Sequence, residues 1–188
     1  IHRKVLSTGK IMTQNESYLA QYKALRTSAL ARIVDICSRD GKAIDNDREG
    51  SLFVRDIVKS FKSGDILLFG KNLPHVLRCH DDYYQGNTKI HARAVSVFFS
   101  QDTLQEILKK LPEGYAIHRL LEYAIYGIKV PSVMEAEIGK KIKDLIALKG
   151  FERILSLLDI LFVISNNENL KFISSASIPL HSVRNNVP

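Results

Sequence analysis

The spacing of hydrophobic positions changes near residue 100 of this 188-residue chain. Before that point, short runs of β-branched and aromatic residues are separated by turn signals such as RDGK at 39–42 and KSGD at 62–65. Several short strands at this spacing predict an antiparallel barrel or sandwich. The predicted strands fall within residues 17–25, 31–38, 51–61, 65–70 and 88–99.

After residue 100 the hydrophobic residues recur at intervals of three and four, which is typical of amphipathic helices. Ser132 and Glu135 indicate a capping box that starts one helix, and Gly150 indicates its end. The next segment, FERILSLLDILFVIS at 151–165, is apolar nearly all the way round. Such a helix must be buried, either in its own domain or against another chain. The periodic positions are Leu104, Ile107, Leu108 and Leu111, then Ile117, Leu120, Leu121 and Ala124, then Ile138, Ile142, Leu145 and Ile146.

The predicted organisation has three parts. Residues 1–99 form a β barrel, residues 100–166 form a helical subdomain with a candidate dimerisation region, and residues 167–188 form a polar tail or linker. The chain begins at Ile1, so we expect a piece of a longer polypeptide. Neither a membrane span nor a signal peptide is visible, and two cysteines are too few for a disulfide scaffold. We therefore expect a cytoplasmic protein.

The formal net charge of +7 raises the question of nucleic-acid binding, because clustered Lys and Arg neutralise phosphates. The basic residues are instead spread from Arg3 to Arg184, and short runs at 109–110 and 140–141 fall on polar helix faces. The sequence holds no helix-turn-helix, zinc-finger or RNA-binding pattern. If the protein contacts DNA, we expect a part outside this chain to do so.

Several segments together carry a resemblance to a known family. They are FVRDIVKSFKSGDILLFGKNLPHVLR at 53–78, AVSVFFSQDTL at 94–104, LPEG at 111–114, IHRLLEYAIYGIKV at 117–130 and RILSLLDILFVIS at 153–165. In this order they resemble the amino-terminal sensor domain of AraC-family transcriptional regulators, in the subgroup similar to mannitol-operon regulators. The resemblance covers about residues 25–176. It implies a cupin barrel followed by helices, a dimer contact through those helices, and a helix-turn-helix DNA-binding domain beyond Pro188.

Cupins often hold a metal ion, whose ligands come from two sequence motifs. One register of the first motif places Arg26 and Ser28 at its histidines and Arg32 at its glutamate, and a second register places Val34 at the glutamate. Neither register supplies a ligand, and the second motif retains only His75. Because a catalytic metal site needs about three converging protein ligands, we expect a metal-free barrel without a cofactor or enzymatic activity.

The segment GDILLFGKNLPH at 64–75 looks like a strand and turn that deliver His75 to a chosen place. A histidine there is a hydrogen-bonded lining residue or an acid–base group, and catalysis would need an orienting partner that the sequence does not indicate. Inward-facing Arg26 and Arg32 would suit a carboxylate, a phosphate or a hydroxyl-rich sugar acid. One or both could instead face solvent across the pleat. Tyr22 and Arg93 are further candidates at the rim of a pocket.

Three functional hypotheses follow. The first is an effector-binding domain of a transcriptional regulator that senses a small molecule, such as a sugar or related metabolite. The second is a small cupin enzyme resembling a sugar isomerase, and the third is a ligand-free structural or dimerisation module. For assembly, we expect a homodimer, unless the helices predicted at 101–127 and 133–149 cover the apolar segment within one chain. The expected dimer contacts are Leu155, Leu158, Leu161 and Phe162.

Overall fold

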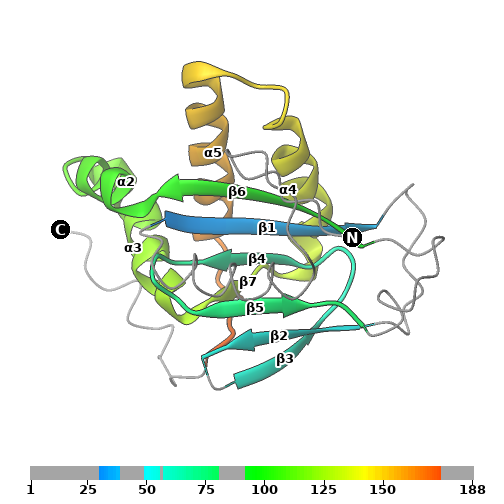
Figure 1. Cartoon of the computed structure of the whole chain (residues 1–188). Coiled ribbons are helices and arrows are strands. Elements are labelled where there is room, and N and C mark those ends of the chain that lie inside the picture. Colours follow the sequence, from blue (N-terminus) through cyan, green and yellow to red (C-terminus); the bar gives the residue numbers. More distant parts are fainter. Residues whose placement is uncertain (1–29, 39–48, 56, 81–91, 175–188) are drawn as a thin grey trace, which may run out of the picture.

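Two antiparallel sheets and four α-helices make up the part of this computed structural model that is described, residues 30–38, 49–55, 57–80 and 92–174 (Figure 1). The strands are β1 Leu30–Ser38, β2 Gly50–Val54, β3 Ile57–Phe61, β4 Ile66–Phe69, β5 His75–Arg78, β6 Ala92–Ser100, β7 Ile128–Lys129 and β8 Lys171–Phe172. The helices are α2 Gln101–Leu108, α3 Tyr115–Tyr123, α4 Ser132–Asp144 and α5 Gly150–Ser165, with short 3₁₀ turns at Pro112–Gly114 and Ala124–Tyr126. The strand predicted at 17–25 lies outside the described residues.

The five-stranded sheet has the order β6-β1-β4-β7-β8, and the three-stranded sheet has the order β3-β2-β5. Successive side chains of β1 point to opposite faces, because the side-chain period of a strand is two. Ala31 and Ile33 join the core beneath the helices, whereas Val34 and Ile36 join a second core that also contains residues of β2 and β3. The five-stranded sheet is therefore the middle of three layers.

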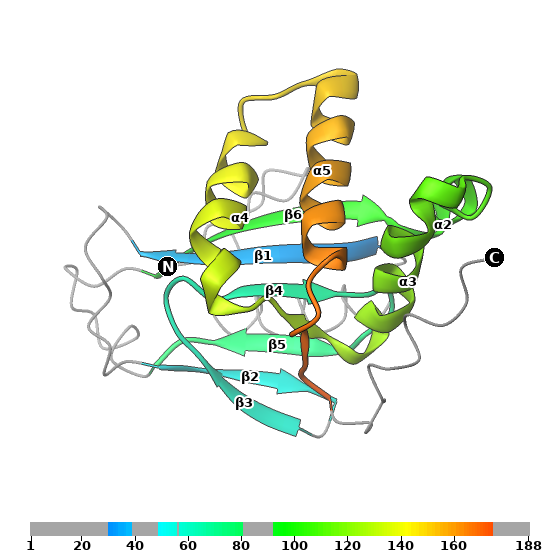
Figure 2. The same cartoon turned by 180° about the vertical axis from the view of Figure 1, so that it is seen from behind.

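The helical layer covers the outer face of this middle sheet, where α4 and α5 cross β1, β4 and β6 (Figure 2). Four side chains of α5 with helical spacing are buried in the core between helices and sheet, namely Leu157, Ile160, Leu161 and Ile164. Leu161 was expected at a dimer interface, and this is wrong because its side chain is fully buried within one chain. Within the described residues, no helix has the length and apolarity needed to span a bilayer.

Antiparallel strands followed by helices agree with the prediction, but the described strands form two open sheets and no closed barrel. The segment 51–61, predicted as one strand, is a hairpin in which Val54 pairs with Ile57. Arg55 takes a left-handed conformation in its turn, with φ of 54°. The sequence lacks the Asn-Gly or Asp-Gly pair that usually marks such a two-residue turn, so the hairpin was missed.

The predicted boundaries of the helical part also need correction. Helix α4 ends at Asp144 because the next residues tighten into turns, and Gly150, with φ of 56°, begins α5 instead of ending α4. Ser132 does not cap α4, because the chain enters the helix from Pro131 and no side chain makes the capping hydrogen bond. The segment after residue 166 is not wholly a linker, since β8 joins the middle sheet and Ile173 is buried.

Candidate functional site

The two sheets meet around the ring of Phe69. Phe69 lies opposite Arg32 in the pairing of β4 with β1, and Phe98 lies opposite Arg32 in the pairing of β6 with β1. The imidazole of His75, the first residue of β5, stacks on the ring of Phe69 with centroids 3.8 Å apart and planes 14° apart. His75 pairs with Val54, whose side chain belongs to the core between the sheets. Arg32 and His75 therefore both adjoin Phe69 on the inner faces of the sheets.

His75 is 4% exposed, and only one of its ring nitrogens has a hydrogen-bond partner among the described residues. Nδ1 lies 2.8 Å from the backbone carbonyl oxygen of Leu73. The pKa of His75 is lowered to about 4, mainly by burial. The hydrogen bond to Leu73 acts in the opposite direction, and the charge of Arg32 also lowers the pKa. A neutral imidazole carries one proton and a carbonyl oxygen can only accept, so Nδ1 holds the proton. Nε2 is left as a buried acceptor.

Arg32 is the charged side chain of this inner region. Its Nε is buried without a hydrogen-bond partner, and its guanidinium carbon lies 5.5 Å from the centroid of the Phe98 ring. Burial lowers the pKa of Arg32 to about 10, so the group stays protonated at neutral pH. Within the described residues no carboxylate forms an ion pair with it. The residue as a whole is only partly buried, but leaving the buried Nε unsatisfied is costly, which makes Arg32 a candidate binding group.

A short turn connects β4 to β5 and sets the position of His75. The amide of Leu73 bonds to the carbonyl of Gly70 at 3.4 Å, and Asn72 takes a left-handed φ of 58°, which asparagine tolerates better than most residues. Gly70 packs directly on the 3₁₀ turn after α3, where its amide donates to Ala124 at 2.8 Å. A Cβ on Gly70 would lie 2.7 Å from the carbonyl carbon of Ala124. The turn is thus pressed against the helical layer.

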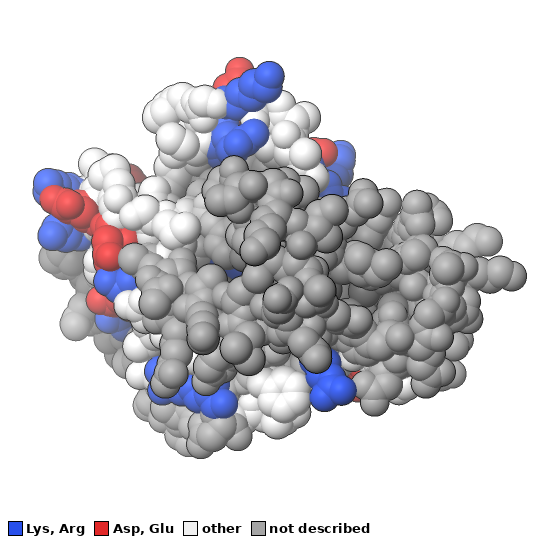
Figure 3. Space-filling model, in the orientation of Figure 1, with Lys and Arg blue, Asp and Glu red and all other residues white. Residues whose placement is uncertain are grey.

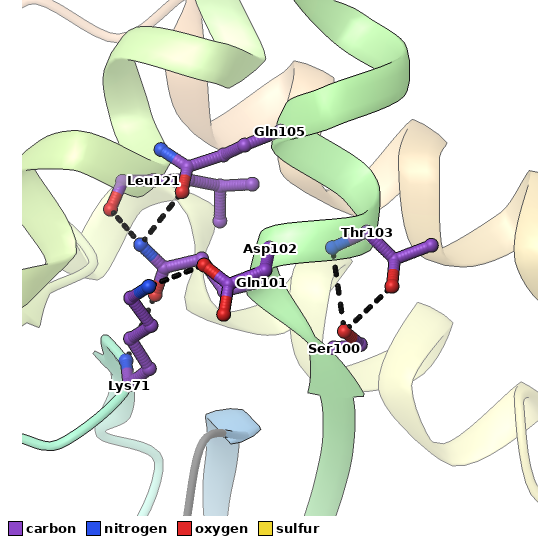
Figure 4. Close-up of polar contacts among 7 residues, drawn as sticks. All are labelled: Lys71, Ser100, Gln101, Asp102, Thr103, Gln105 and Leu121. Atoms are coloured by element: carbon purple, nitrogen blue, oxygen red, sulfur yellow. Dashed lines mark hydrogen bonds and ion pairs between the residues drawn. The ribbon is translucent and has the colours of Figure 1, made fainter.

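Gln101, the first residue of α2, ties this turn to the helices (Figure 4). Its side-chain oxygen accepts a hydrogen bond from the backbone amide of Lys71 at 2.8 Å. Its amide nitrogen donates to the backbone carbonyl of Leu121 in α3 at 2.9 Å. Lys71 and Asp102 add an ion pair beside it. Because Gln101 is 2% exposed, both of its backbone contacts are sheltered from water.

A second polar cluster lies under the start of α4. Asp65 accepts a bond from Lys129 of β7 at 2.6 Å and from the amide of Lys62 at 3.0 Å. Burial raises the pKa of Glu135, and the negative charge of Asp65 raises it further. Asp35, nearby on β1, lies 3.7 Å from Lys143, and burial raises its pKa too. Lys129 pairs with Asp65 within the sheet, and Lys143 of α4 pairs with Asp35 of β1, so we interpret the cluster as structural, although one oxygen of each of its three carboxylates is buried without a hydrogen-bond partner.

The predicted site residues divide into three groups. Arg32 and His75 lie together between the sheets, as described above. Tyr22 and Arg26 lie outside the described residues, and for Arg93 the structure describes the strand but not the side chain. Among the described residues, no three His, Cys, Asp or Glu side chains gather as a metal site would require. Phe69, Phe98 and Gln101 were missed, because their roles depend on pairing between distant segments.

The charge on His75 gives a testable pH dependence. Its folded-state pKa is lowered to about 4, so the neutral form stabilises the fold fully above the unfolded pKa of about 6.5, and this contribution is lost as pH falls towards 4. We expect the free energy of unfolding of the wild type, relative to that of His75→Phe, to fall by about 2 kcal/mol between pH 7 and pH 5. Urea denaturation at the two pH values measures this difference.

Comparison with His75→Phe is needed because Asp35 and Glu135 act in the opposite direction. Their raised pKa values make protonation favour the folded state as the pH falls, and both residues are present in both proteins. Phenylalanine also keeps an aromatic ring against Phe69. An unchanged difference between pH 7 and pH 5 would mean that His75 is not held neutral by burial.

The described surface does not present a continuous basic stripe on the face drawn in Figure 3. Basic side chains there form separate groups, and those around α2 are mixed with acidic ones, including the Lys110–Glu106 pair. The described part of this face therefore carries mixed charge without a concentrated basic patch. No protein-family model, curated protein or solved structure matches the chain.

Proposed function

We propose that this chain is the effector-binding and dimerisation domain of an AraC-type transcriptional regulator. In this proposal, a small metabolite binds between the sheets of a metal-free, cupin-like fold, beside Arg32 and His75. DNA is contacted by a helix-turn-helix domain elsewhere in the same polypeptide. The proposal joins the sequence resemblance to the chemistry of the inner residues.

One observation carries the binding part of the proposal. Arg32 Nε and His75 Nε2 are both buried without a hydrogen-bond partner, and Phe69 is the cross-strand partner of Arg32 and the stacking partner of His75. Buried polar groups are nearly always satisfied, because an unsatisfied group costs about 1–3 kcal/mol. A module that binds nothing gains no benefit from keeping two such groups at one place. A polar ligand would satisfy both of them.

The turn at 70–75 offers a route from ligand to helices. His75 bonds to Leu73 within this turn, and the turn is held to α2 and α3 by Gln101 and to the segment after α3 by Gly70. A ligand that shifts His75 would therefore act on the helical layer through hydrogen bonds already in place. The turn at 70–75 contacts α2 directly, so no other element is needed to connect His75 to the helices.

The test of this proposal is the variant Arg32→Met in thermal and urea denaturation. Removing this partly buried charge, whose Nε has no hydrogen-bond partner, should leave the ligand-free protein at least as stable as the wild type, since an apolar replacement avoids the cost of desolvation. The same variant should lose the increase in melting temperature that a metabolite library produces in the wild type. A ligand at 100 times its Kd adds about 2.7 kcal/mol of stability.

Lys59→Met is the matched control, because it removes the same charge from an exposed position on β3. It should leave both stability and ligand response near those of the wild type. If Arg32→Met destabilises the protein instead, the guanidinium has a structural role and the binding proposal loses its basis. If no sugar, polyol, acid or amino acid in the library stabilises the wild type, a ligand-free module is the better interpretation.

A further inference from the structure

We propose that the metabolite is a hydroxy acid, whose carboxylate binds Arg32 and whose hydroxyl donates a hydrogen bond to Nε2 of His75. This inference rests on the proposed binding function and names the chemical class of the ligand. It separates hydroxy acids from the neutral sugars and polyols that the sequence resemblance suggests. The carboxylate is inferred from the charge of Arg32, and the hydroxyl is inferred from the lone pair on Nε2 of His75.

The hydroxyl follows from the tautomer of His75. The carbonyl of Leu73 accepts the one proton of the neutral ring at Nδ1, over 2.8 Å. Nε2 therefore presents a lone pair, and it is buried with no donor among the described residues. A carboxylate or a phosphate dianion offers no proton to such an atom, whereas an alcohol hydroxyl does. The ligand must carry a hydrogen-bond donor at this position.

The carboxylate follows from the charge balance around Arg32. Arg32 supplies one partly buried positive charge, His75 is neutral, and no acidic side chain is paired with Arg32 among the described residues. A carboxylate carries one negative charge and matches the planar guanidinium with two parallel bonds. A phosphate monoester carries about 1.5 to 2 negative charges at pH 7, which would leave excess charge between the rings of Phe69 and Phe98.

The spacing of the two contacts requires a small ligand. His75 stacks directly on Phe69, with ring centroids 3.8 Å apart, and Arg32 is the cross-strand partner of Phe69. Cross-strand partners have Cβ atoms roughly 5 Å apart. The carboxylate and the hydroxyl that reach these two side chains therefore belong to one compact molecule. Short hydroxy acids and sugar acids have both groups within a few carbon atoms.

The test compares ligands that differ in one group only. D-gluconate has both groups, D-sorbitol has the same carbon chain without the carboxylate, and hexanoate has the carboxylate without hydroxyls. Lactate, glycerate and threonate extend the hydroxy acids to shorter chains. We expect at least one hydroxy acid at about 10 mM to raise the melting temperature of the wild type clearly. Its matched alcohol and its hydroxyl-free acid should bind roughly tenfold or more weakly in calorimetry.

Substitutions at Arg32 and at His75 locate the binding. Arg32→Met should weaken the hydroxy acid roughly 10- to 100-fold, and Arg32→Lys should restore part of that loss because the positive charge returns. His75→Phe should weaken it about tenfold while leaving the hydroxyl-free acid unchanged. Lys59→Met should change neither. In ¹⁵N-histidine-labelled protein, the hydroxy acid should shift the Nε2 resonance of His75 and leave it in the neutral range at pH 7.

The outcomes separate this inference from the proposed function. If sorbitol or another neutral sugar protects as well as gluconate, the hydroxy-acid assignment is wrong while a metabolite-binding domain remains. If hexanoate binds as tightly as gluconate, the His75 contact is wrong. If no hydroxy acid binds at about 10 mM but another library compound does, the ligand class is again wrong and the binding function stands.

Discussion

If the chain forms the proposed homodimer, replacing Leu155 and Phe162 together with glutamate is expected to make it a monomer. Phe151, Leu155 and Phe162 on α5 are 69%, 52% and 47% exposed, and Leu158 between them is half-buried. Their spacing of four, three and four residues is that of a seam between two packed helices. A second copy of α5 would cover this stripe, and twofold symmetry would make every contact occur twice. Four buried carboxylates per dimer would then oppose association.

We expect the double variant to raise the dissociation constant of the dimer at least 100-fold, about 2.7 kcal/mol. Light scattering and sedimentation at micromolar concentration measure this change. Val133→Glu is the control, because Val133 is an 86% exposed apolar residue on α4 outside the stripe. A wild type that remains monomeric on concentration would contradict the interface. Equal dissociation in the Val133 variant would move the contact away from α5.

Gln101→Leu is expected to lower the free energy of unfolding by about 3 kcal/mol. Leucine fills a similar volume but offers no partner to the amide of Lys71 or the carbonyl of Leu121. Each buried backbone group that loses its partner costs about 1–3 kcal/mol. Urea denaturation should show a lower midpoint with an unchanged slope, because the surface exposed on unfolding stays the same.

Gln105→Leu provides the matched comparison for Gln101→Leu. Gln105 is one turn along α2, and its side-chain oxygen accepts only a 3.2 Å bond from Gln101. Its replacement should cost less than about 1 kcal/mol. Similar losses from both variants would mean that α2 is sensitive at many positions and that Gln101 has no special connecting role.

The β-branched residues at 31–38 and the turn signal after them predicted a strand, but they could not decide which face of β1 turned inward. Arg32 shares its face with Val34, and both faces of β1 are buried, one under helices and one under the other sheet. A strand covered on both sides lacks the polar alternation that reveals orientation. The inward position of Arg32 was therefore one of two predicted alternatives, and the pairing of distant strands decided it.

The helices show the same limit in another form. Their existence followed from periodicity, but the apolar composition of α5 predicted burial all the way round, whereas only one face of the helix is buried within the chain. The sequence could not show which positions of α5 are exposed. Leu161 and Phe162 are both apolar, yet Leu161 is fully buried and Phe162 is half exposed. The orientation of α5 on the sheet determines which of the two side chains is buried. Gln101 was missed since nothing local links it to Lys71, 30 residues earlier.

The position of residues 173–174 has a mechanical consequence. Ile173 packs into the core between the sheets and lies beside Gly127, as does Leu73, whose carbonyl holds the ring of His75. The amide and hydroxyl of Ser174 both bond to the carbonyl of Tyr126. Ile173 and Ser174 are therefore held directly against residues that adjoin the proposed ligand site. A small displacement of Leu73 would be transmitted to both of them.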